Sequence, residues 1–394
     1  MRCRPAAPRV LVLAVDPFGV GGIERFTRVF LHCLQELFGP DEVGLVSLGS
    51  LRSHDPGCRV LHAGTSQRLG FRKKVRYLAA SLRAAHRWRE GLVVVACHSR
   101  LAPVAWLCRF VTGAPYLVWC YGKEVWRKPS RSVRLGLGRA DVAVAISEFT
   151  AAAVAEQFRP KVLRIIHPCV FPPFTGTGAM GSGEKADAAV RPRVITVARL
   201  DAGDSYKGVD TLLCGWPRVL DRVPDAELLV VGEGSARRDL ERLARQVGVQ
   251  GRVRFVGRLS DPELCRAYRA ADVFAMPGRA ELGPRAYGEG FGIVFVEAAA
   301  IGLPVVAGRA GGAPEAMVEG VTGLLVDPLD PEDVAGAVSS LLLDPALARR
   351  MGAAGMRVAA ERFSYPVFRD KVGHLFGSIR KEASPCAGSS ECSP

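Results

Sequence analysis

The sequence has few aromatic residues and no arrangement of cysteines that would hold a metal. Aromatics make up 7% of the 394 residues, so alanine, valine and leucine must form most of the core. The eleven cysteines include no Cys-x-x-Cys pair and no Cys/His cluster with zinc spacing. Cys33, Cys97 and Cys120 lie in apolar runs, as small core residues do, and this usage fits a reducing compartment. We predict no metal site.

Long hydrophobic runs are also missing. The first apolar run, from Val10 to Val15, is short and ends at Asp16. The longest, from Leu101 to Tyr121, is interrupted by Arg109, two prolines and a glycine, and it predicts a helix, a turn and a buried strand. We therefore expect a cytoplasmic protein, either dissolved or attached to the cytoplasmic face of the membrane.

Acidic residues are outnumbered. There are 53 Lys and Arg residues against 39 Asp and Glu, which gives a net charge of +14 and predicts anionic partners. No recognition helix, zinc finger or aromatic RNA-binding strand stands out, so nucleic acid is not an expected partner. No Gly-x-x-x-x-Gly-Lys-Ser/Thr pattern is present, so an ATPase is not favoured. Phosphorylated small molecules and anionic lipids remain.

Short apolar runs rich in valine, leucine and isoleucine alternate with helical patterns. Such runs are typical of strands buried on both faces of a parallel sheet. Between the first two runs, Glu24 to Phe38 carries apolar residues at helical spacing, so we predict doubly wound α/β sheets. The predicted strands cover residues 9–15, 43–47, 92–97, 116–119, 142–146 and 162–166, then 194–197, 227–231, 253–256, 273–275, 304–307 and 324–326.

A segment rich in glycine, proline and small residues separates the two series and predicts a linker. We expect an N-terminal domain over residues 1–172, the linker over 173–191 and a C-terminal domain over 192–362. A last helix is predicted over 363–382, and the tail 383–394 has the composition of a disordered segment. Two such domains place a cleft between their sheets, and ligands bind beyond the carboxyl ends of the strands.

Two carboxylates flank a glycine-rich segment that runs from Gly288 to Glu297. Residues 293–300 favour a helix, so we expect Glu289 on a loop and Glu297 on the helix after it. Free N–H groups at a helix N-terminus bind anions, and carboxylates accept hydrogen bonds from polyols. The segment therefore suits a sugar attached to a nucleoside diphosphate. A loop–helix junction with two solvated glutamates is the alternative.

The segment from Glu289 to Asp327 resembles the donor-binding signature of glycosyltransferase family 4, whose members have the GT-B fold. It includes Gly311-Gly312-Ala313-Pro314-Glu315. Val197 to Leu200, together with Tyr206-Lys207-Gly208, resembles the family's diphosphate-binding stretch. The glycines and the glutamate of residues 19–24 resemble its N-terminal glycine loop. The resemblance covers nearly the whole chain except the linker and the tail.

This resemblance implies two Rossmann-like domains facing a cleft, with the last helix crossing back to pack on the N-terminal domain. It implies transfer of a hexosyl group from a nucleoside-diphosphate sugar, with retention and without a metal or other cofactor. The implied acceptor is a glycan or a lipid-linked acceptor in synthesis of cell-envelope polysaccharide or glycolipid. The base of the donor and its sugar stay open.

The resemblance assigns catalytic roles to Arg199, Lys207 and Glu289. Negative charge develops on the diphosphate as the glycosidic bond breaks, so fixed cations stabilise the transition state more than the ground state. Arg199 and Lys207 would supply them, while Glu289 would contact the donor sugar. No residue presents itself as a carboxylate nucleophile. The resemblance implies that the leaving phosphate itself helps to deprotonate the acceptor. An ordinary solvated Arg and Lys is the alternative.

Further residues are implied on each side of the cleft. Those expected to bind the donor are Gly290, Phe291, Gly292, Ile293, Glu297, Val256 and Arg258. Those expected on the acceptor side or in a phosphate loop are Gly21, Gly22, His98, Tyr121 and Glu124. Family members often have histidine where this chain has Tyr121, so no imidazole role is expected there. A glycine-rich turn can also serve only as a connection, and a lone histidine such as His98 is often structural.

Positive charge concentrates in two acid-free stretches of the first half. From Arg68 to Arg89 there are eight Lys or Arg residues, interleaved with apolar and aromatic residues at roughly helical spacing. The second stretch runs from Arg127 to Arg139. A basic amphipathic helix can lie on an anionic membrane surface. A core-facing helix with a solvated outer face is the alternative.

Rival functions share this architecture, because fold does not determine chemistry. A nucleotide-sugar epimerase and a non-catalytic nucleotide-sugar-binding protein are the two alternatives. A phosphorylase would need a cofactor-lysine signature, which the sequence lacks. A non-catalytic relative would usually have lost Arg199, Lys207 or one of the two glutamates. All four are present, which favours the transferase.

Overall fold

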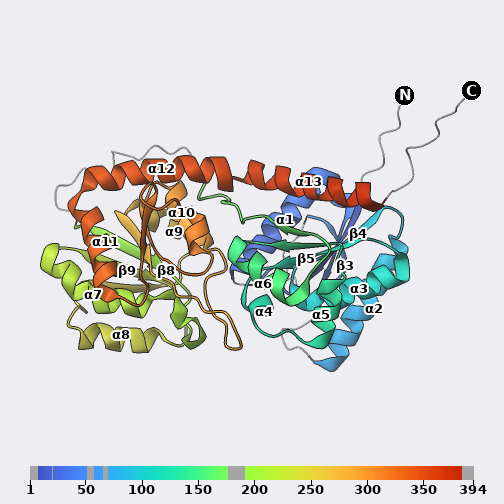
Figure 1. Cartoon of the computed structure of the whole chain (residues 1–394), viewed down its shortest axis with the longest axis horizontal. Helices are drawn as coiled ribbons and strands as arrows, with labels where there is room; N and C mark the ends of the chain where they lie inside the picture. The colour runs from blue at the N-terminus through green and yellow to red at the C-terminus, as the bar shows by residue number, and fades with distance from the viewer. Residues whose placement is uncertain (1–7, 20, 51–56, 65–69, 176–190, 384–394) are drawn as a thin grey trace, which may run out of the picture. The chain divides into compact units, whose positions relative to one another are not determined.

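The computed structural model describes residues 8–19, 21–50, 57–64, 70–175 and 191–383 (Figure 1). The chain forms two compact units, of which unit 1 comprises Met1–Ile166 and Phe368–Pro394 and unit 2 comprises His167–Val367. Most of the predicted linker, nearly all of the predicted tail and Arg68 lie outside the described residues.

In the described part of unit 1, seven strands form a parallel sheet in the order β3-β2-β1-β4-β5-β6-β7. The strands are β1 (Arg9–Ala14), β2 (Val43–Ser47), β3 (Arg59–His62), β4 (Leu92–Ala96), β5 (Tyr116–Cys120), β6 (Val142–Ala145) and β7 (Leu163–Ile165). The sequence predicts all of them except β3. That strand lies at the edge of the sheet and has no buried residue, so it lacks the apolar run that marks the others.

Helices cover both faces of this sheet (Figure 1). They are α1 (Gly22–Phe38), α2 (Phe71–Arg87), α3 (Ala102–Thr112), α4 (Lys123–Trp126), α5 (Arg131–Gly138) and α6 (Glu148–Phe158), with the short turns η1 (Pro40–Glu42) and η2 (Ser99–Leu101). On one face, α3 packs against both α2 and α5. On the other face, the ring of Phe38 in α1 lies 5.0 Å from that of Phe376. The predicted doubly wound arrangement is confirmed for this unit.

Unit 2 contains a second parallel sheet, with the strand order β10-β9-β8-β11-β12-β13. The strands are β8 (Arg193–Val197), β9 (Glu227–Val231), β10 (Val253–Gly257), β11 (Val273–Met276), β12 (Val305–Gly308) and β13 (Gly323–Val326). Its helices are α7 (Val209–Arg222), α8 (Arg237–Gln246), α9 (Asp261–Arg269), α10 (Ile293–Ala300), α11 (Pro331–Leu343) and α12 (Pro345–Phe363), with η3 (Ala202–Lys207) and η4 (Ala313–Ala316). The sequence predicts every strand of this sheet.

The return of the chain to unit 1 runs through α13 (Tyr365–Ala383). The sequence predicts one helix from residue 363, but Ser364 has an extended backbone, so α12 and α13 are separate. From Phe368 onward α13 belongs to unit 1, where the ring of Phe368 lies 5.7 Å from that of Phe26 in α1.

The boundary at which the chain first passes from unit 1 to unit 2 also differs from the prediction. The sequence predicts it at residue 172, but unit 2 begins at His167. Two contacts explain why the segment after β7 belongs to unit 2. The N–H of Val170 donates to the carbonyl oxygen of Phe363 at 2.8 Å. The thiol of Cys265, in α9, donates to the carbonyl oxygen of Pro173 at 3.5 Å.

The interior matches the expectation from composition. Cys33, Cys97 and Cys120 are buried and free, so they pack as small apolar residues. The run from Leu101 to Tyr121 forms a helix, a turn and a buried strand, in the predicted order. Among the described helices, none combines the length and the hydropathy that a bilayer span requires.

Candidate active site

Three loops bring the predicted catalytic residues to one edge of the unit 2 sheet. Arg199 follows β8, Lys207 ends η3, and Glu289 lies between β11 and α10. Strands β8 and β11 are paired in parallel. The carboxyl ends of parallel strands meet at the same edge, where the N-terminus of the following helix also lies. The predicted catalytic residues therefore share one site.

The loop from Gly288 to Gly292, here called the donor loop, is held by close backbone approaches. Gly292 has φ 84°, which only glycine adopts without strain, and α10 begins at the next residue. The N–H of Gly312 donates to the carbonyl oxygen of Glu289 at 2.9 Å, and a side chain on Gly312 would collide with the carbonyl of Gly290. The predicted loop followed by a helix is thus confirmed.

Lys207 and Glu289 form an ion pair between the Lys207 Nζ and a Glu289 carboxylate oxygen. Both side chains are largely buried, with exposed fractions of 17% and 14%. Burial alone lowers the pKa of Lys207, but the nearby charge of Glu289, helped by Tyr206, outweighs it and holds that pKa above its ordinary value. The lysine therefore stays charged. Its Nζ also lies 5.3 Å from the centroid of the Tyr206 ring.

Arg199 is held by two carboxylates of the same loop region. Its Nε donates to Asp204, and a carboxylate oxygen of Asp201 lies 3.7 Å from the same nitrogen. The hydrogen bond with Asp204 raises the pKa of Arg199. Asp204 is 5% exposed whereas Arg199 is 61% exposed, so the guanidinium is anchored at one nitrogen and open to a ligand at the others. The sequence did not point to either aspartate.

Two further residues of the donor motif, Phe291 and Glu297, face the interior. Glu297 lies in α10 with an exposed fraction of 2%, and Phe291 is 1% exposed. The alternative of two solvated glutamates is therefore wrong. Donor binding by Glu297 stays a prediction, as does donor binding by Gly290, Phe291, Gly292 and Ile293.

A neighbouring loop, Gly232 to Ser235 after β9, braces the Arg199 loop and was missed by the sequence analysis. The N–H of Leu200 donates to the carbonyl oxygen of Glu233 at 2.9 Å, and the N–H of Ser235 donates to Asp201 at 3.0 Å. The two glycines that flank Glu233 after an apolar run were the available signal. A backbone in tight contact with the Arg199 loop helps to hold the arginine in place.

A second brace involves Arg279, in the segment after β11. Its guanidinium donates to the carbonyl oxygen of Ser205 at 2.6 Å and to both carboxylate oxygens of Asp210 at 2.5 and 2.6 Å. These bonds tie that segment to η3 and to the start of α7. The stretch that ends at Lys207 is therefore held in place by hydrogen bonds from Arg279.

Two of the predicted donor-binding residues, Val256 and Arg258, lie at the end of β10. Val256 is half-buried in the strand, whereas Arg258 is exposed just beyond it. Gly257 lies between these two residues, and the carboxylate of Glu233 is close to it. Donor binding by Val256 and Arg258 stays a prediction.

In unit 1, His98, Tyr121 and Glu124 lie together at the carboxyl ends of β4 and β5. The His98 and Tyr121 rings are 6.4 Å apart, and the Tyr121 N–H donates to a Glu124 carboxylate oxygen at 2.6 Å. Tyr121 is buried against Phe26, with ring centroids 5.4 Å apart. Burial raises the pKa of Tyr121 well above its ordinary value, so its hydroxyl stays neutral. Its ring is thus part of the core.

His98 has a structural task. Its Nδ1 accepts a hydrogen bond from the N–H of Arg100 at 3.1 Å and caps η2. Burial lowers the pKa of His98, partly offset by Glu124, so the neutral ring is favoured. A neutral Nδ1 is what this bond requires, because a protonated nitrogen cannot accept.

The glycine loop of unit 1 leads directly into α1. Gly21 is the residue before the helix, with no side-chain cap, and Gly22 is its first residue. Glu24 lies in the first turn. The helix begins two residues before Glu24, the start that the sequence predicts. Gly22 is therefore helical and not part of the turn. Their role in binding phosphate stays a prediction.

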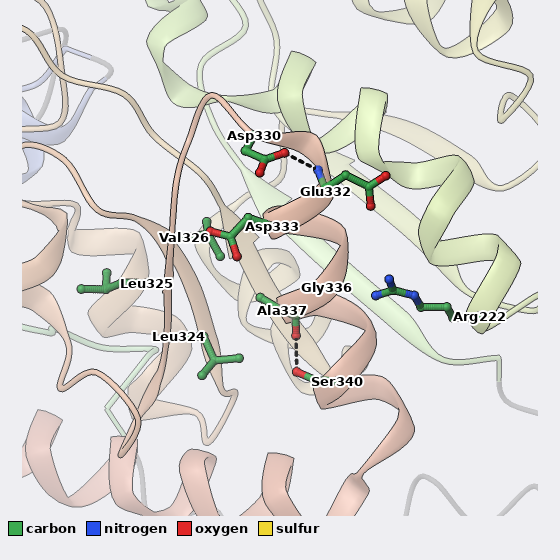
Figure 2. Close-up of a pocket in the computed structure, with 10 residues that line it drawn as sticks. All are labelled: Arg222, Leu324, Leu325, Val326, Asp330, Glu332, Asp333, Gly336, Ala337 and Ser340. Atoms are coloured by element: carbon green, nitrogen blue, oxygen red, sulfur yellow. Dashed lines mark hydrogen bonds between the residues drawn. The ribbon is translucent and has the colours of Figure 1, made fainter.

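An open depression of about 620 Å³ lies elsewhere on unit 2, along β13 and α11 (Figure 2). None of the predicted site residues lines it. Two of its polar side chains are engaged locally: Asp330 accepts from the Glu332 N–H at 2.9 Å, and Ser340 donates to the Ala337 carbonyl at 2.8 Å (Figure 2). This depression is separate from the site at Lys207.

Two family profiles match the chain. The family described as Glycosyl transferases group 1 matches residues 185–358, and the one described as Glycosyltransferase Family 4 matches residues 20–172. The chain therefore belongs to the group 1, family 4 glycosyltransferases, as the sequence resemblance indicated.

Two mycobacterial relatives share one description, GDP-mannose-dependent alpha-(1-6)-phosphatidylinositol monomannoside mannosyltransferase. The protein from Mycolicibacterium smegmatis is 37% identical over 252 residues, which cover 62% of this chain and 64% of that protein. The protein from Mycobacterium tuberculosis is 38% identical over 271 residues, which cover 64% of this chain and 68% of that protein. The chain thus matches about two thirds of the length of these relatives.

Among solved structures, sucrose-phosphate synthase from Thermosynechococcus elongatus aligns with a TM-score of 0.77. Its sequence is 23% identical, and the alignment covers 95% of this chain and 100% of that chain. The likeness confirms the predicted GT-B fold.

Proposed function

We propose that the chain transfers a mannosyl group from GDP-mannose to a phosphatidylinositol-based glycolipid acceptor, with retention. The contact between Lys207 and Glu289 carries the proposed chemistry, because it places a cation for phosphate beside a carboxylate for sugar hydroxyls. The two mycobacterial relatives support the choice of mannose donor and lipid acceptor. Synthesis of a cell-envelope glycolipid is the process that would use this product.

In this mechanism Arg199 and Lys207 bind the diphosphate of the donor. Lys207 exchanges the Glu289 carboxylate for a phosphate oxygen, and Glu289 then accepts hydrogen bonds from the sugar. The bond between the anomeric carbon and the diphosphate oxygen breaks while the acceptor oxygen bonds to that carbon. The acceptor proton passes to the leaving diphosphate. Both cations stabilise the charge that develops there.

Cationic side chains take the place of a metal in this proposal. In the described ranges, no three His, Cys, Asp or Glu side chains gather as metal ligands would. Arg199 and Lys207 share the sheet edge where the diphosphate would lie, and this location supports the proposal. Transfer that is unchanged by a chelator is the expected result, and restoration of a lost activity by Mg²⁺ or Mn²⁺ would contradict it.

A matrix of donors and acceptors tests the function directly. GDP-mannose, UDP-glucose and UDP-N-acetylglucosamine would each be offered with phosphatidylinositol, its monomannoside or inositol 3-phosphate. We expect transfer from GDP-mannose to a lipid acceptor, with an α-anomeric product by NMR. Glu289→Gln is the matched inactive control. Inversion of the free donor would instead indicate an epimerase, and nucleotide binding without any turnover would indicate a binding protein.

A membrane-facing surface on unit 1 is the second part of the proposal. Helix α2 buries one face, which includes Tyr77, Ala80 and Ala84. Its first two turns expose Phe71, at 81%, together with Arg72 and Lys74. The same sheet face carries α5, where an open depression of about 560 Å³ is lined by Arg131, Leu135 and other residues, mostly arginines. Exposed aromatic and basic residues together suit an anionic bilayer.

Vesicle co-sedimentation tests this surface. Each Lys or Arg near an anionic surface contributes about 1 kcal/mol, so Arg72→Ala with Lys74→Ala should weaken binding to anionic vesicles about 30-fold. Added salt should weaken wild-type binding too. Arg349→Ala with Arg350→Ala, an exposed pair on α12 of unit 2, is the matched control. Equal recovery on neutral and anionic vesicles would contradict the proposal.

A further inference from the structure

His167 lies where the chain enters unit 2. It is close to the point where the chain leaves this unit. It follows β7 and is the first residue of unit 2, and Phe363 ends α12 just before the chain turns into α13. The centroid of the His167 ring lies 5.7 Å from that of Phe363, in an edge-to-face geometry of 79°. The bond from the Val170 N–H to the Phe363 carbonyl closes this meeting point at 2.8 Å.

The same imidazole stacks on the donor loop. Its ring centroid is 5.1 Å from that of Phe291, and the planes differ by 26°. Phe291 in turn contacts Phe363 at 5.5 Å, with both rings nearly fully buried. The three rings form one cluster, and Phe291 is two residues from Glu289. A stacked pair of this kind stabilises the cluster beyond the area it buries.

A hydrogen bond joins His167 to the segment that holds the donor loop from the other side. Its Nε2 lies 3.2 Å from a carboxylate oxygen of Glu315, and both side chains are largely buried. The carboxylate only accepts, so Nε2 carries the proton. The N–H of Glu315 donates to the Gly312 carbonyl at 3.2 Å, and the N–H of Gly312 donates to the Glu289 carbonyl at 2.9 Å.

We propose that His167 is a positioning residue for donor binding, holding the donor loop through the Phe291 ring and the Glu315 carboxylate. The inference deepens the proposed function and rests on its assignment of Glu289 to the donor sugar. The two contacts grip the loop from two directions, at Phe291 and through Gly312. A small displacement of the loop would move Glu289 relative to Lys207. Misplacement of a group at an active site by about 1 Å can lower the reaction rate about 100-fold.

The two contacts can be removed separately. His167→Phe keeps the aromatic stack and loses the N–H donor, while His167→Gln keeps a donor and loses the ring. His167→Ala loses both. We expect the Kd of GDP-mannose, measured by calorimetry on the full chain, to rise about tenfold in His167→Ala and less in the other two. Partial rescue by each conservative variant separates positioning from folding.

Steady-state kinetics supply the second readout. A positioning role raises the KM for the donor and leaves the KM for the acceptor unchanged. A merely structural role lowers the melting temperature and the active fraction, but leaves the Kd of the folded protein at the wild-type value, and that result would overturn the inference. His32→Ala, an exposed histidine on α1, is the matched control and should match wild type.

Hydrogen exchange of the unliganded protein tests the inference even if the proposed function fails. Peptides that cover residues 288–292 and 311–316 should exchange about tenfold faster in His167→Ala, while peptides from β8 and β9 should not change. Unchanged exchange in both loops would refute the positioning role. Failure of wild type to bind any nucleoside diphosphate would refute the proposed function alone.

Discussion

Two regions of the molecule, the candidate site in unit 2 and the start of α2 in unit 1, arrange their positive charge in opposite ways. At the carboxyl edge of the unit 2 sheet, cations lie against carboxylates: Lys207 on Glu289, and Arg199 on Asp204. In unit 1, the basic residues at the start of α2, such as Arg72 and Lys74, stand on an exposed helix surface without an acid in the same stretch.

This difference separates two uses of charge. A paired cation in a largely buried site has a definite position and can meet one group of a ligand with definite geometry. An exposed basic surface has a diffuse field that attracts any anionic surface and weakens with salt. The site in unit 2 thus has the properties of a specific binding site, whereas the start of α2 has those of the membrane-facing surface proposed above.

Loss of Lys207 should have the largest effect. Lys207→Ala removes the cation and leaves Glu289 without this partner, so we expect the transfer rate to fall about 10²–10³-fold, with weaker binding of GDP. Calorimetry with GDP and a transfer assay measure both. The control is Lys161→Ala, because Lys161 is an exposed lysine of unit 1 paired with Asp141. Unchanged GDP binding would exclude Lys207 from the donor site.

A smaller effect is expected when Arg199 loses its anchor. Asp204→Asn removes the buried charge that directs the guanidinium, so the KM for the donor should rise about tenfold. The exposed Asp239, which pairs with Arg242, provides the matched control Asp239→Asn. The opposite outcome, tighter binding of GDP, would mean that Asp204 only reduces the charge of the site, and the contrast between the two units would lose its meaning.

The smallest effect concerns His98 of unit 1. Its pKa is lowered on folding, so below about pH 6.5 the unfolded chain binds more protons. This contribution to stability is therefore present above pH 6.5 and is lost as the pH falls toward the lowered pKa. His98→Asn keeps an acceptor for the Arg100 N–H without titrating.

Chemical unfolding at pH 7.5 and at pH 5.5 measures this difference. We expect wild type to lose up to about 1 kcal/mol more than His98→Asn on acidification, which is the size of one hydrogen bond. His32→Asn is the control for an exposed histidine. Identical losses in all three proteins would show that the cap of η2 does not depend on a neutral ring.

Much of the fold could be predicted because the central strands are continuous apolar runs. The exception, β3, lies at an edge with exposed side chains, so its residues do not differ from those of a loop. The division between units was predicted less well, because the contact of Val170 with Phe363 joins residues far apart in sequence. Contacts between residues far apart in the sequence cannot be predicted from local composition.

The site shows the same limit. The glycine pattern and the resemblance identified Arg199, Lys207 and Glu289, which the structure brings to one edge of the sheet. Neither gave the partner of each cation, since Lys207 and Glu289 are 82 positions apart. The sequence also did not show that long-range packing against Phe26 buries the ring of Tyr121, whose acceptor-side role stays a prediction. Partners and burial depend on tertiary structure, whereas motifs are local.

The ion pair between Lys207 and Glu289 has a consequence for turnover. In the mechanism proposed above, a whole nucleotide sugar replaces both halves of the pair, because its phosphate would satisfy the ammonium and its hydroxyls would satisfy the carboxylate. The nucleoside diphosphate left after transfer can satisfy only the ammonium. Re-formation of the pair then competes with the spent nucleotide, so the empty site itself would favour product departure and the next cycle.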